Sequence, residues 1–156
     1  MTKTIELTQG KVALVDDADY EWINAFKWYY CKGYAVRKVG WPNRKCLYMH
    51  RVILGTPDGL ETDHVNGDGV DNRKINLRAC TRSENQRNIG RTSSNTSGFK
   101  GVFWSKSASK WMAQIKLNGH PTHIGCFSTT EEAAQAYNEA CVKLHGEFAR
   151  LNEALG

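Results

Sequence analysis

Long hydrophobic runs are absent from this 156-residue sequence. No apolar run approaches the roughly 20 residues that a membrane-spanning helix requires, so no membrane association is expected. Residues 1–6 contain no apolar signal core, and an intracellular location is expected. The five cysteines are scattered and form no C-x-x-C pair, which argues against a structural zinc site or a disulfide framework.

Acidic residues are missing from residues 85–130, although the whole chain carries a formal net charge of only +5. Two tryptophans, Trp104 and Trp111, are interleaved there with bases. The bases of this stretch are Arg87, Arg91, Lys100, Lys106, Lys110 and Lys116. A basic stretch with aromatic residues suits contact with a nucleic-acid backbone. The alternative is that these residues form only a solvated basic face.

The order of strand and helix signals predicts an α+β fold in two parts. Residues 1–90 form the first part, in which residues 1–55 are strand-rich and Lys32-Gly33 marks a hairpin turn. Residues 62–65 and 76–80 are predicted as paired strands, and the capping box Thr81-x-x-Glu84 predicts a following helix. Residues 91–98 have the composition of a linker. Residues 99–156 then form a second domain.

The second domain is predicted to be a three-stranded antiparallel sheet packed on one helix. Its strands are expected at residues 100–104, 111–117 and 122–127, and Asn118-Gly119 is a hairpin signal between the last two. Thr129-x-x-Glu132 is a capping box, so a helix should begin there and end at Gly146.

A compact set of chemical groups lies in the centre of the chain. Phosphodiester hydrolysis needs a base for water and positive charge on the phosphate. A neutral imidazole such as His64 can act as the base near pH 7. The oxygens of Asp63 and Asn85 suit a hard cation such as Mg²⁺. As neighbours on a strand, Asp63 and His64 are expected on opposite faces unless the backbone twists.

The residues around this set resemble the HNH homing endonucleases of phages and introns. The resemblance is carried by Asp63-His64, Asn66-Gly67, Asp71-Asn72-Arg73, Asn76-Leu77-Arg78 and Ser83-Glu84-Asn85-Gln86, in a stretch covering residues 49–88. It implies a beta-beta-alpha-metal core with His64 as general base and Asn76 as the asparagine that braces the loop. It further implies that Asp63 and Asn85 bind Mg²⁺ or Mn²⁺. Met49-His50-Arg51 also resembles a segment of these proteins, without an assigned role.

Several of these residues are also compatible with ordinary structural roles. The Asp-, Asn- and Gly-rich loop could bind calcium, but it lacks the alternating oxygen ligands and the closing Glu of an EF-hand. A histidine beside an aspartate is most often structural. Asn72 and Asn76 could be plain turn and bracing residues. Arg73 and Arg78 could bind phosphates or form ordinary salt bridges.

Residues 97–152 resemble the plant ethylene-response-factor (APETALA-two type) DNA-binding domain. The carrying residues include Ser97-Gly98-Phe99-Lys100-Gly101-Val102, Lys110-Trp111, Glu131-Glu132-Ala133-Ala134 and Phe148-Ala149. The resemblance implies a sheet inserted in the major groove of DNA. The predicted DNA-binding residues of the whole chain are Arg73, Arg78, Lys100, Trp104, Lys106, Lys110, Trp111, Gln114 and Lys116. Lysines replace several family arginines, and lysine reads guanine less well. Trp111 could face DNA or pack against the helix.

The sequence thus predicts a metal-dependent, site-specific DNA endonuclease acting on double-stranded DNA. It would leave a 5′-phosphate and a 3′-hydroxyl, as the resemblance implies, by nicking or by double-strand cutting. A phage-encoded protein of this kind would act in the cytoplasm of a bacterial host, and no protein partner is evident. The alternative is a non-catalytic DNA-binding transcriptional regulator. An RNA-directed protein is disfavoured, because the deep A-form major groove would not admit the sheet.

Overall fold

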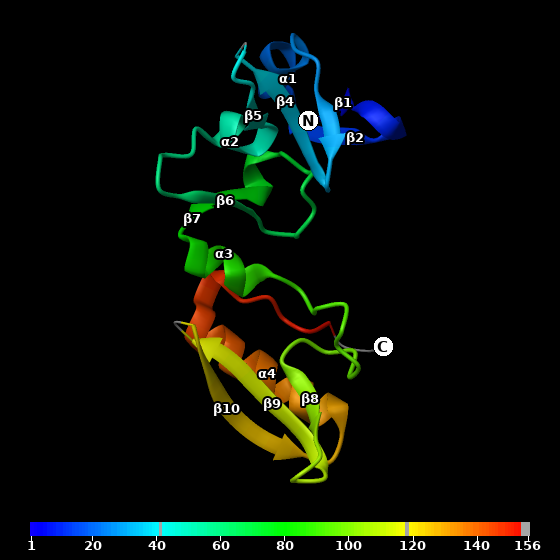
Figure 1. The fold of residues 1–156 in the computed structure, drawn as a ribbon, viewed down its shortest axis with the longest axis vertical. Helices are drawn as coiled ribbons and strands as arrows, with labels where there is room; N and C mark the ends of the chain where they lie inside the picture. Colours follow the sequence, from blue (N-terminus) through cyan, green and yellow to red (C-terminus); the bar gives the residue numbers. More distant parts are fainter. Residues whose placement is uncertain (41, 118, 154–156) are drawn as a thin grey trace. The chain divides into compact units, whose positions relative to one another are not determined.

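The computed structural model describes residues 1–40, 42–117 and 119–153 as an α+β fold of small antiparallel sheets and short helices, which confirms the predicted fold class (Figure 1). The chain divides into two compact units, Met1–Arg82 and Ser83–Gly156. The division falls at the start of helix α3 (Arg82–Asn88). Residues 91–98 have neither helix nor strand, and their role as a domain boundary stays a prediction. Within the described ranges, no helix has both the length and the apolar character to cross a membrane.

The first unit contains three small sheets connected by short helices. Its elements are β1 (Thr2–Glu6), η1 (Thr8–Gly10), β2 (Val12–Asp16), α1 (Asp17–Asn24), β3 (Tyr29–Cys31), β4 (Tyr34–Val39), β5 (Lys45–Tyr48), α2 (Met49–Leu54), β6 (Glu61–His64), η2 (Lys74–Asn76) and β7 (Leu77–Cys80). Strands β1 and β2 pair with each other, β3, β4 and β5 form a second sheet, and β6 pairs with β7. The predicted hairpin is confirmed, since Lys32 and Gly33 both have positive φ between β3 and β4.

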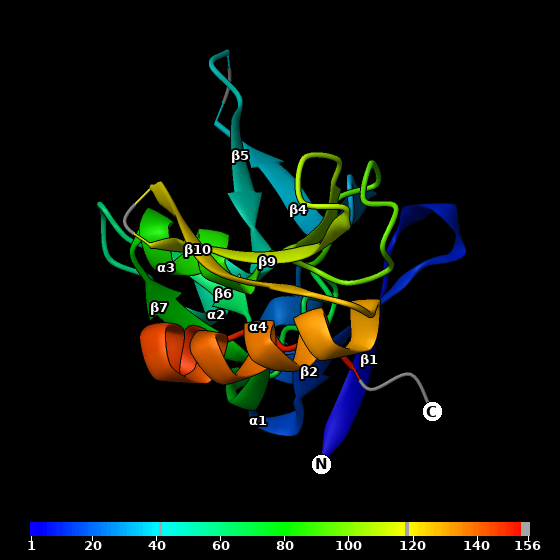
Figure 2. The same ribbon diagram turned by 90° about the horizontal axis from the view of Figure 1, so that it is seen from below.

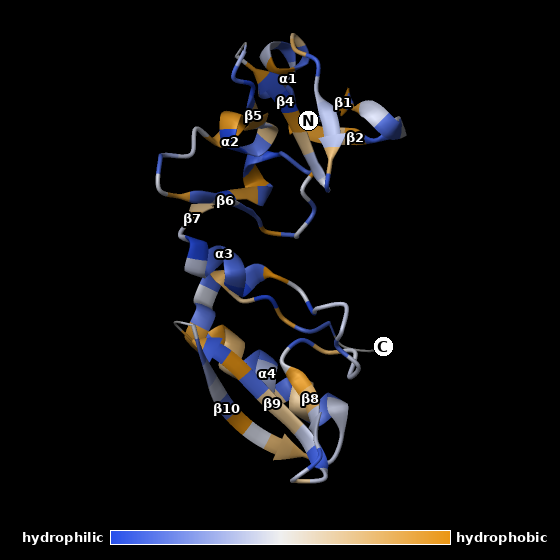
Figure 3. Cartoon of the chain, viewed as in Figure 1, coloured by the Kyte–Doolittle hydropathy of each residue, from blue (hydrophilic) through white to orange (hydrophobic). Residues whose placement is uncertain are grey.

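One hydrophobic core joins these sheets and helices. Its buried residues are Ile5, Leu7, Ala13, Val15, Ile23, Trp28, Ala35, Met49, Ile53 and Leu77. Most of them come from β1, β2, α1, β4, α2 and β7, and the apolar character of α2 is visible in Figure 3. The indole nitrogen of Trp28 donates to the Ile23 carbonyl at 2.9 Å, so this buried side chain keeps a hydrogen bond. Leu77 belongs to this core and is the first residue of β7, so the core extends to the strand pair β6–β7.

Helix α2 is an element that local sequence patterns do not predict. Residues 1–55 are expected to be strand-rich, yet the chain turns into a helix directly after β5. Met49 and Ile53, one helical turn apart, are buried in the core, and Gly55 ends the helix with φ 63°. Six residues are too short to display a helical period, so packing against the core decides this helix.

The second unit contains the predicted three-stranded sheet and helix. Its strands are β8 (Val102–Ser105), β9 (Lys110–Leu117) and β10 (His120–Phe127), in the order β10-β9-β8. Helix α4 (Thr130–His145) covers one face of this sheet (Figure 2). The 3₁₀ turn η3 (Gly146–Phe148) follows it. The capping box of Thr129 and Glu132 is confirmed, and Gly146 follows the last helical residue. Of the predicted turn pair, Asn118 lies outside the described residues, and Gly119 has φ 84°.

Candidate active site

Strands β6 and β7 place the central histidine and aspartate. Asp63 lies opposite Arg78 in the antiparallel register, and His64 lies opposite Leu77. Arg78 donates from Nε and Nη2 to Oδ2 of Asp63 at 2.8 and 2.6 Å. The side chains of Arg78 and Asp63 are only 16% and 5% exposed. A carboxylate is therefore fixed in a largely buried position beside a permanent cation.

His64 has different neighbours from Asp63, as expected for successive residues of a strand. Its ring lies edge-on to His50 of α2, with centroids 4.8 Å apart, and 5.9 Å from the ring of Tyr34 in β4. Burial lowers the pKa of His64, whereas the side chain of Asn72 and the negative charge of Asp63 act in the opposite direction. The imidazole is thus held in place by rings on one side and by polar loop residues on another.

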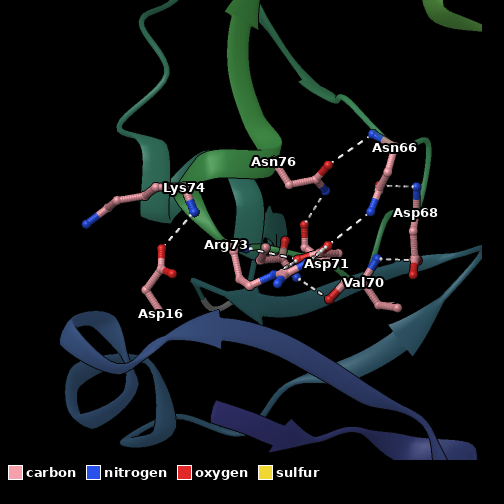
Figure 4. A network of polar contacts seen from close by, with 9 residues as sticks. Asp16, Asn66, Asp68, Val70, Asp71, Arg73, Lys74 and Asn76 are labelled. Atoms are coloured by element: carbon pink, nitrogen blue, oxygen red, sulfur yellow. Dashed lines mark hydrogen bonds and ion pairs between the residues drawn. The ribbon is translucent and has the colours of Figure 1, made fainter. Parts of the chain in front are cut away.

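Asn76 connects the two ends of the loop between β6 and β7 (Figure 4). Its Oδ1 accepts from the backbone nitrogen of Asn66 at 3.0 Å, and its Nδ2 donates to the Asp71 carbonyl at 2.8 Å. The Val65 backbone nitrogen donates to the Asn76 carbonyl at 2.9 Å. The residue directly after His64 is therefore tied to the start of β7. This side chain braces the loop, which limits the backbone freedom of His64.

The loop interior is a second set of polar contacts (Figure 4). Asp71 is buried and accepts from Nδ2 of Asn66 at 3.0 Å. Arg73 donates from Nε and Nη2 to the two carboxylate oxygens of Asp71 at 2.7 and 2.6 Å, and these bonds lower the pKa of Asp71. Asp68 accepts from the Val70 nitrogen at 3.1 Å. These aspartates satisfy the loop's own donors, which is the structural reason for its Asp- and Asn-rich composition.

Strand β2 of the N-terminal sheet is hydrogen-bonded to the loop between β6 and β7. The Leu14 nitrogen donates to the Val70 carbonyl at 2.9 Å, and the Asn72 nitrogen donates to the Leu14 carbonyl at 2.8 Å. Strand β2 thereby gains a short parallel bridge to the loop at Leu14 and Asp71. The Lys74 backbone nitrogen donates to Oδ2 of Asp16 at 2.8 Å, which fixes the loop's other end (Figure 4). Residues from the start of the chain thus position the segment that surrounds His64.

Tyr34 fixes the loop from another side. A methyl group added at Gly69 would lie 2.7 Å from the ring of Tyr34 and would also meet the Gly33 carbonyl. The hairpin of β3 and β4 therefore packs so closely on the loop that only glycine fits at this position.

Three similarities to known proteins bear on this site. A family model for HNH endonucleases matches residues 48–87, the stretch from the end of β5 to α3. An uncharacterized HNH endonuclease of Acanthamoeba polyphaga mimivirus is 30% identical over 152 residues, covering 93% of this chain and 76% of the relative. The chain belongs to the HNH endonuclease family. This HNH-type nuclease is also 34% identical over 95 residues to Protein 3.8 of Escherichia phage T7, covering 61% of the chain and 78% of that protein. No solved structure matches the chain.

The C-terminal part is similar to a different group of proteins. An ethylene-responsive transcription factor of Medicago truncatula is 33% identical over 85 residues, covering 53% of this HNH endonuclease and 31% of the plant protein. A dehydration-responsive element-binding protein of Arabidopsis thaliana is 33% identical over 86 residues, covering 54% of the chain and 41% of that protein. The predicted combination of an HNH unit with a plant-type DNA-binding unit is thereby confirmed.

HNH nucleases generally depend on a divalent metal, and the donors near His64 suit one. Within the parts of the chain that the structure describes, no group of three or more His, Cys, Asp or Glu side chains is arranged around a common point. A calcium-type cage of several carboxylates is therefore not present there. The carboxylate of Asp63 is a hard oxygen donor with fixed orientation. Asn85 lies in α3, beyond the division between the units, and its role as the second ligand stays a prediction.

The predicted DNA-contacting lysines and tryptophans lie in different places in the second unit. Ala113 and Ile115 of β9 are buried in the clusters formed with α4, so the alternate residues belong to the other face of the sheet. These alternate residues are Lys110, Met112, Gln114 and Lys116. Three of the predicted contacts thus share the face directed away from the helix.

Trp111 lies on the helix side of the sheet. It is partly buried and packs against the cluster that contains Phe99, Val102 and Ala133, which answers the question that the sequence leaves open about its packing. Trp104 is its cross-strand partner, with ring centroids 5.3 Å apart, and remains half exposed. Contact of these tryptophans with DNA stays a prediction, but it would occur away from the lysine face.

Lys100 is held inside the unit. Its ammonium donates to the Arg87 carbonyl, and burial lowers its pKa. Asn152 accepts from the Lys100 nitrogen at 2.6 Å and donates to its carbonyl at 3.1 Å, so the end of the chain secures this residue. Lys106 lies in the exposed turn between β8 and β9. Of these two predicted contacts, Lys106 is exposed and Lys100 is half-buried.

Three neighbours of His64 carry no local signal of their role, namely Tyr34, His50 and Asn72. His50 stands out in the sequence only as part of Met49-His50-Arg51. Burial lowers the pKa of His50 to about 3, with smaller contributions from His64 and Arg51. Asn72 resembles a plain turn residue, yet it is fully buried and donates from Nδ2 to the Val70 carbonyl at 3.0 Å. No local pattern could have revealed Tyr34, because its contacts at the site lie far away in the chain.

Proposed function

We propose that this protein is a metal-dependent, site-specific DNA endonuclease in which His64 is the general base. The observation that carries the proposal is the position of His64 at the end of β6. His64 directly follows Asp63, whose carboxylate Arg78 fixes, its backbone is braced through Asn76, and its ring is confined by His50 and Tyr34. A base that removes a proton from water needs this kind of fixed orientation.

Each neighbouring residue has a distinct part in this proposal. His64 accepts a proton from the attacking water. Asp63 presents a carboxylate whose orientation Arg78 fixes, and Asn76 limits the movement of the loop. Asp63 and Asn85 would hold Mg²⁺ or Mn²⁺, which supplies positive charge to the phosphate and to the leaving oxygen. Arg78 also adds a permanent cation close to the site.

The second unit would supply affinity for double-stranded DNA. Its lysines project from the sheet face opposite α4, and lysine suits phosphate contact better than bidentate recognition of guanine. Binding by this face should therefore depend strongly on salt. The catalytic unit would then act on DNA that the second unit keeps bound.

The test uses purified full-length protein with supercoiled plasmid and Mg²⁺, and EDTA as the control. Single-turnover cleavage at saturating protein should fall by about 10²- to 10⁴-fold in His64→Ala, since this is the range for loss of a general base. DNA affinity in gel shifts should remain close to that of the parent. His120→Ala, at an exposed histidine of β10, is the matched control and should cleave normally. A His64→Ala rate within about threefold of the parent would exclude His64 as the base.

The metal ligands have their own test. Asp63→Ala and Asn85→Ala should lose cleavage in Mg²⁺ and regain part of it at high Mn²⁺, because Mn²⁺ binds such sites more tightly and accepts imperfect geometry. Asp58→Ala removes an exposed carboxylate and should leave the metal dependence unchanged. Normal cleavage by both ligand variants in low Mg²⁺ would show that these residues do not bind the metal.

A further inference from the structure

The first unit has an acid-free segment of its own. No Asp or Glu occurs from Trp22 to Pro57, whereas this stretch contains seven basic residues. They are Lys27, Lys32, Arg37, Lys38, Arg44, Lys45 and Arg51. The segment includes the whole sheet β3–β4–β5, to which neither the motif nor the family similarity assigns more than a supporting role.

The register of this sheet assembles one row of side chains on a single face. Tyr34, Val36 and Lys38 alternate along β4 and share this face. Tyr29 of β3 and Tyr48 of β5 both lie opposite Val36, so they join the same face. Ala35 points to the other face, where it is buried in the core. The row of tyrosines and Lys38 is thus directed away from the core, and we call it the tyrosine face.

A hollow of about 700 Å³ lies on the tyrosine face. Tyr29 and Val36 form part of its apolar wall, and Lys38 and Arg44 are its charged residues. None of the described residues that line it carries a carboxylate. An open apolar hollow with positive charge and an exposed aromatic ring is suited to the sugars, bases and phosphates of a polynucleotide.

The tyrosine face leads directly to His64. Tyr34 and Tyr48 are 39% and 38% exposed, and their rings lie edge to face with centroids 5.8 Å apart. Both rings contact His50, at 5.4 and 5.3 Å, and Tyr34 reaches His64 at 5.9 Å. A strand that lies along this face would therefore pass from the hollow to the proposed base over the surface formed by these rings.

We propose that the tyrosine face binds the DNA nucleotides next to the scissile phosphate. Lys38 and Arg44 contact phosphates, and Tyr29 packs against a sugar or base. The occupant is nucleic acid because the hollow combines positive charge with an acid-free segment, and because its surface continues to the catalytic histidine. The inference rests on the proposed function, since it takes DNA as the substrate. It gives the first unit a binding surface of its own, separate from the lysine face of the second unit.

The experiment measures the affinity of full-length protein for a fluorescent duplex of about 30 base pairs in EDTA over a series of salt concentrations. Lys38→Gln should reduce the slope of log affinity against log salt by about 0.9, the value for one lost phosphate contact. Tyr29→Ser should weaken binding by about fivefold or more, with little change of slope, since it removes packing and no charge. Lys27→Gln, an exposed lysine of the same segment outside the hollow, is the matched control and should leave both quantities unchanged. Circular dichroism verifies that all variants are folded.

Two results would overturn the inference. One is a parental slope for Lys38→Gln together with an affinity of Tyr29→Ser within about twofold of the parent. The other is a parent dimer, seen by sedimentation, that Tyr29→Ser dissociates without any effect on DNA binding, because the face would then be a protein interface. Plasmid cleavage by the parent is measured in parallel. Its failure would reject the proposed function, whereas the binding data judge the tyrosine face by themselves.

Discussion

Acid should destabilise the first unit through His50. This histidine is 7% exposed, and its neighbours are rings of three other elements, namely Tyr34 of β4, Tyr48 of β5 and His64 of β6. Arg51 is a fixed charge that lowers its pKa further. Among the described residues, Nδ1 of His50 has no hydrogen-bond partner. A proton on this ring would therefore introduce an uncompensated charge into a buried aromatic cluster.

The size of the effect follows from the two pKa values of His50. The folded value is about 3 and the unfolded value is 6.5. Because the folded pKa is lowered, the unfolded state binds more protons below pH 6.5, so stability decreases as the pH falls. Between about pH 7.5 and pH 5, His50 alone should lower the free energy of unfolding by about 2 kcal/mol. Burial lowers the pKa of His64 as well, so the parent should lose more than this.

The assay is urea unfolding at about pH 7.5 and pH 5, followed by tryptophan fluorescence, to which the buried Trp28 of the first unit contributes. His50→Phe keeps an aromatic ring and removes the titration, so its loss of stability on acidification should be about 2 kcal/mol smaller than that of the parent. His120→Ala removes an exposed histidine and should behave like the parent. Equal losses for the parent and His50→Phe would refute the conclusion that burial keeps His50 neutral.

Two further substitutions test the supports of the site. Arg78→Met leaves the buried Asp63 carboxylate without its cation and should destabilise the protein by about 3 kcal/mol in thermal unfolding. Lys3→Met removes one partner of an exposed ion pair and should have little effect, and equal effects of the two changes would contradict this account. Gly69→Ala places a methyl group against a ring of β4, so it should cost about 1–3 kcal/mol and slow plasmid cleavage. Gly90→Ala is its control, because a methyl group added there would meet no atom within 4 Å. A Gly69→Ala variant with parental stability and cleavage rate would show that the loop tolerates displacement.

Local sequence patterns predicted most elements of the fold. The strands β6 and β7 agree with the predicted ranges within one or two residues. Strand and turn signals can be recognised from a few adjacent residues, so a local pattern is enough to predict them. The hairpin at Lys32-Gly33 and the capping box at Thr129 are equally local, and both are confirmed. Strand ends were less accurate, since β8 begins at Val102 rather than at residue 100. Helix α2 was missed because six residues cannot establish a period.

The sequence alone determined the family of the chain and predicted the residues of its site. Residue type and the resemblance to the HNH family point to Asp63 and His64, and the resemblance alone points to Asn76. Tertiary structure decided which groups surround them. Arg78 pairs with Asp63 across two strands, His50 meets His64 from another helix, and Leu14 holds a loop that is distant in the chain. Such contacts depend on how separate elements pack against a common core, and no local pattern records that packing.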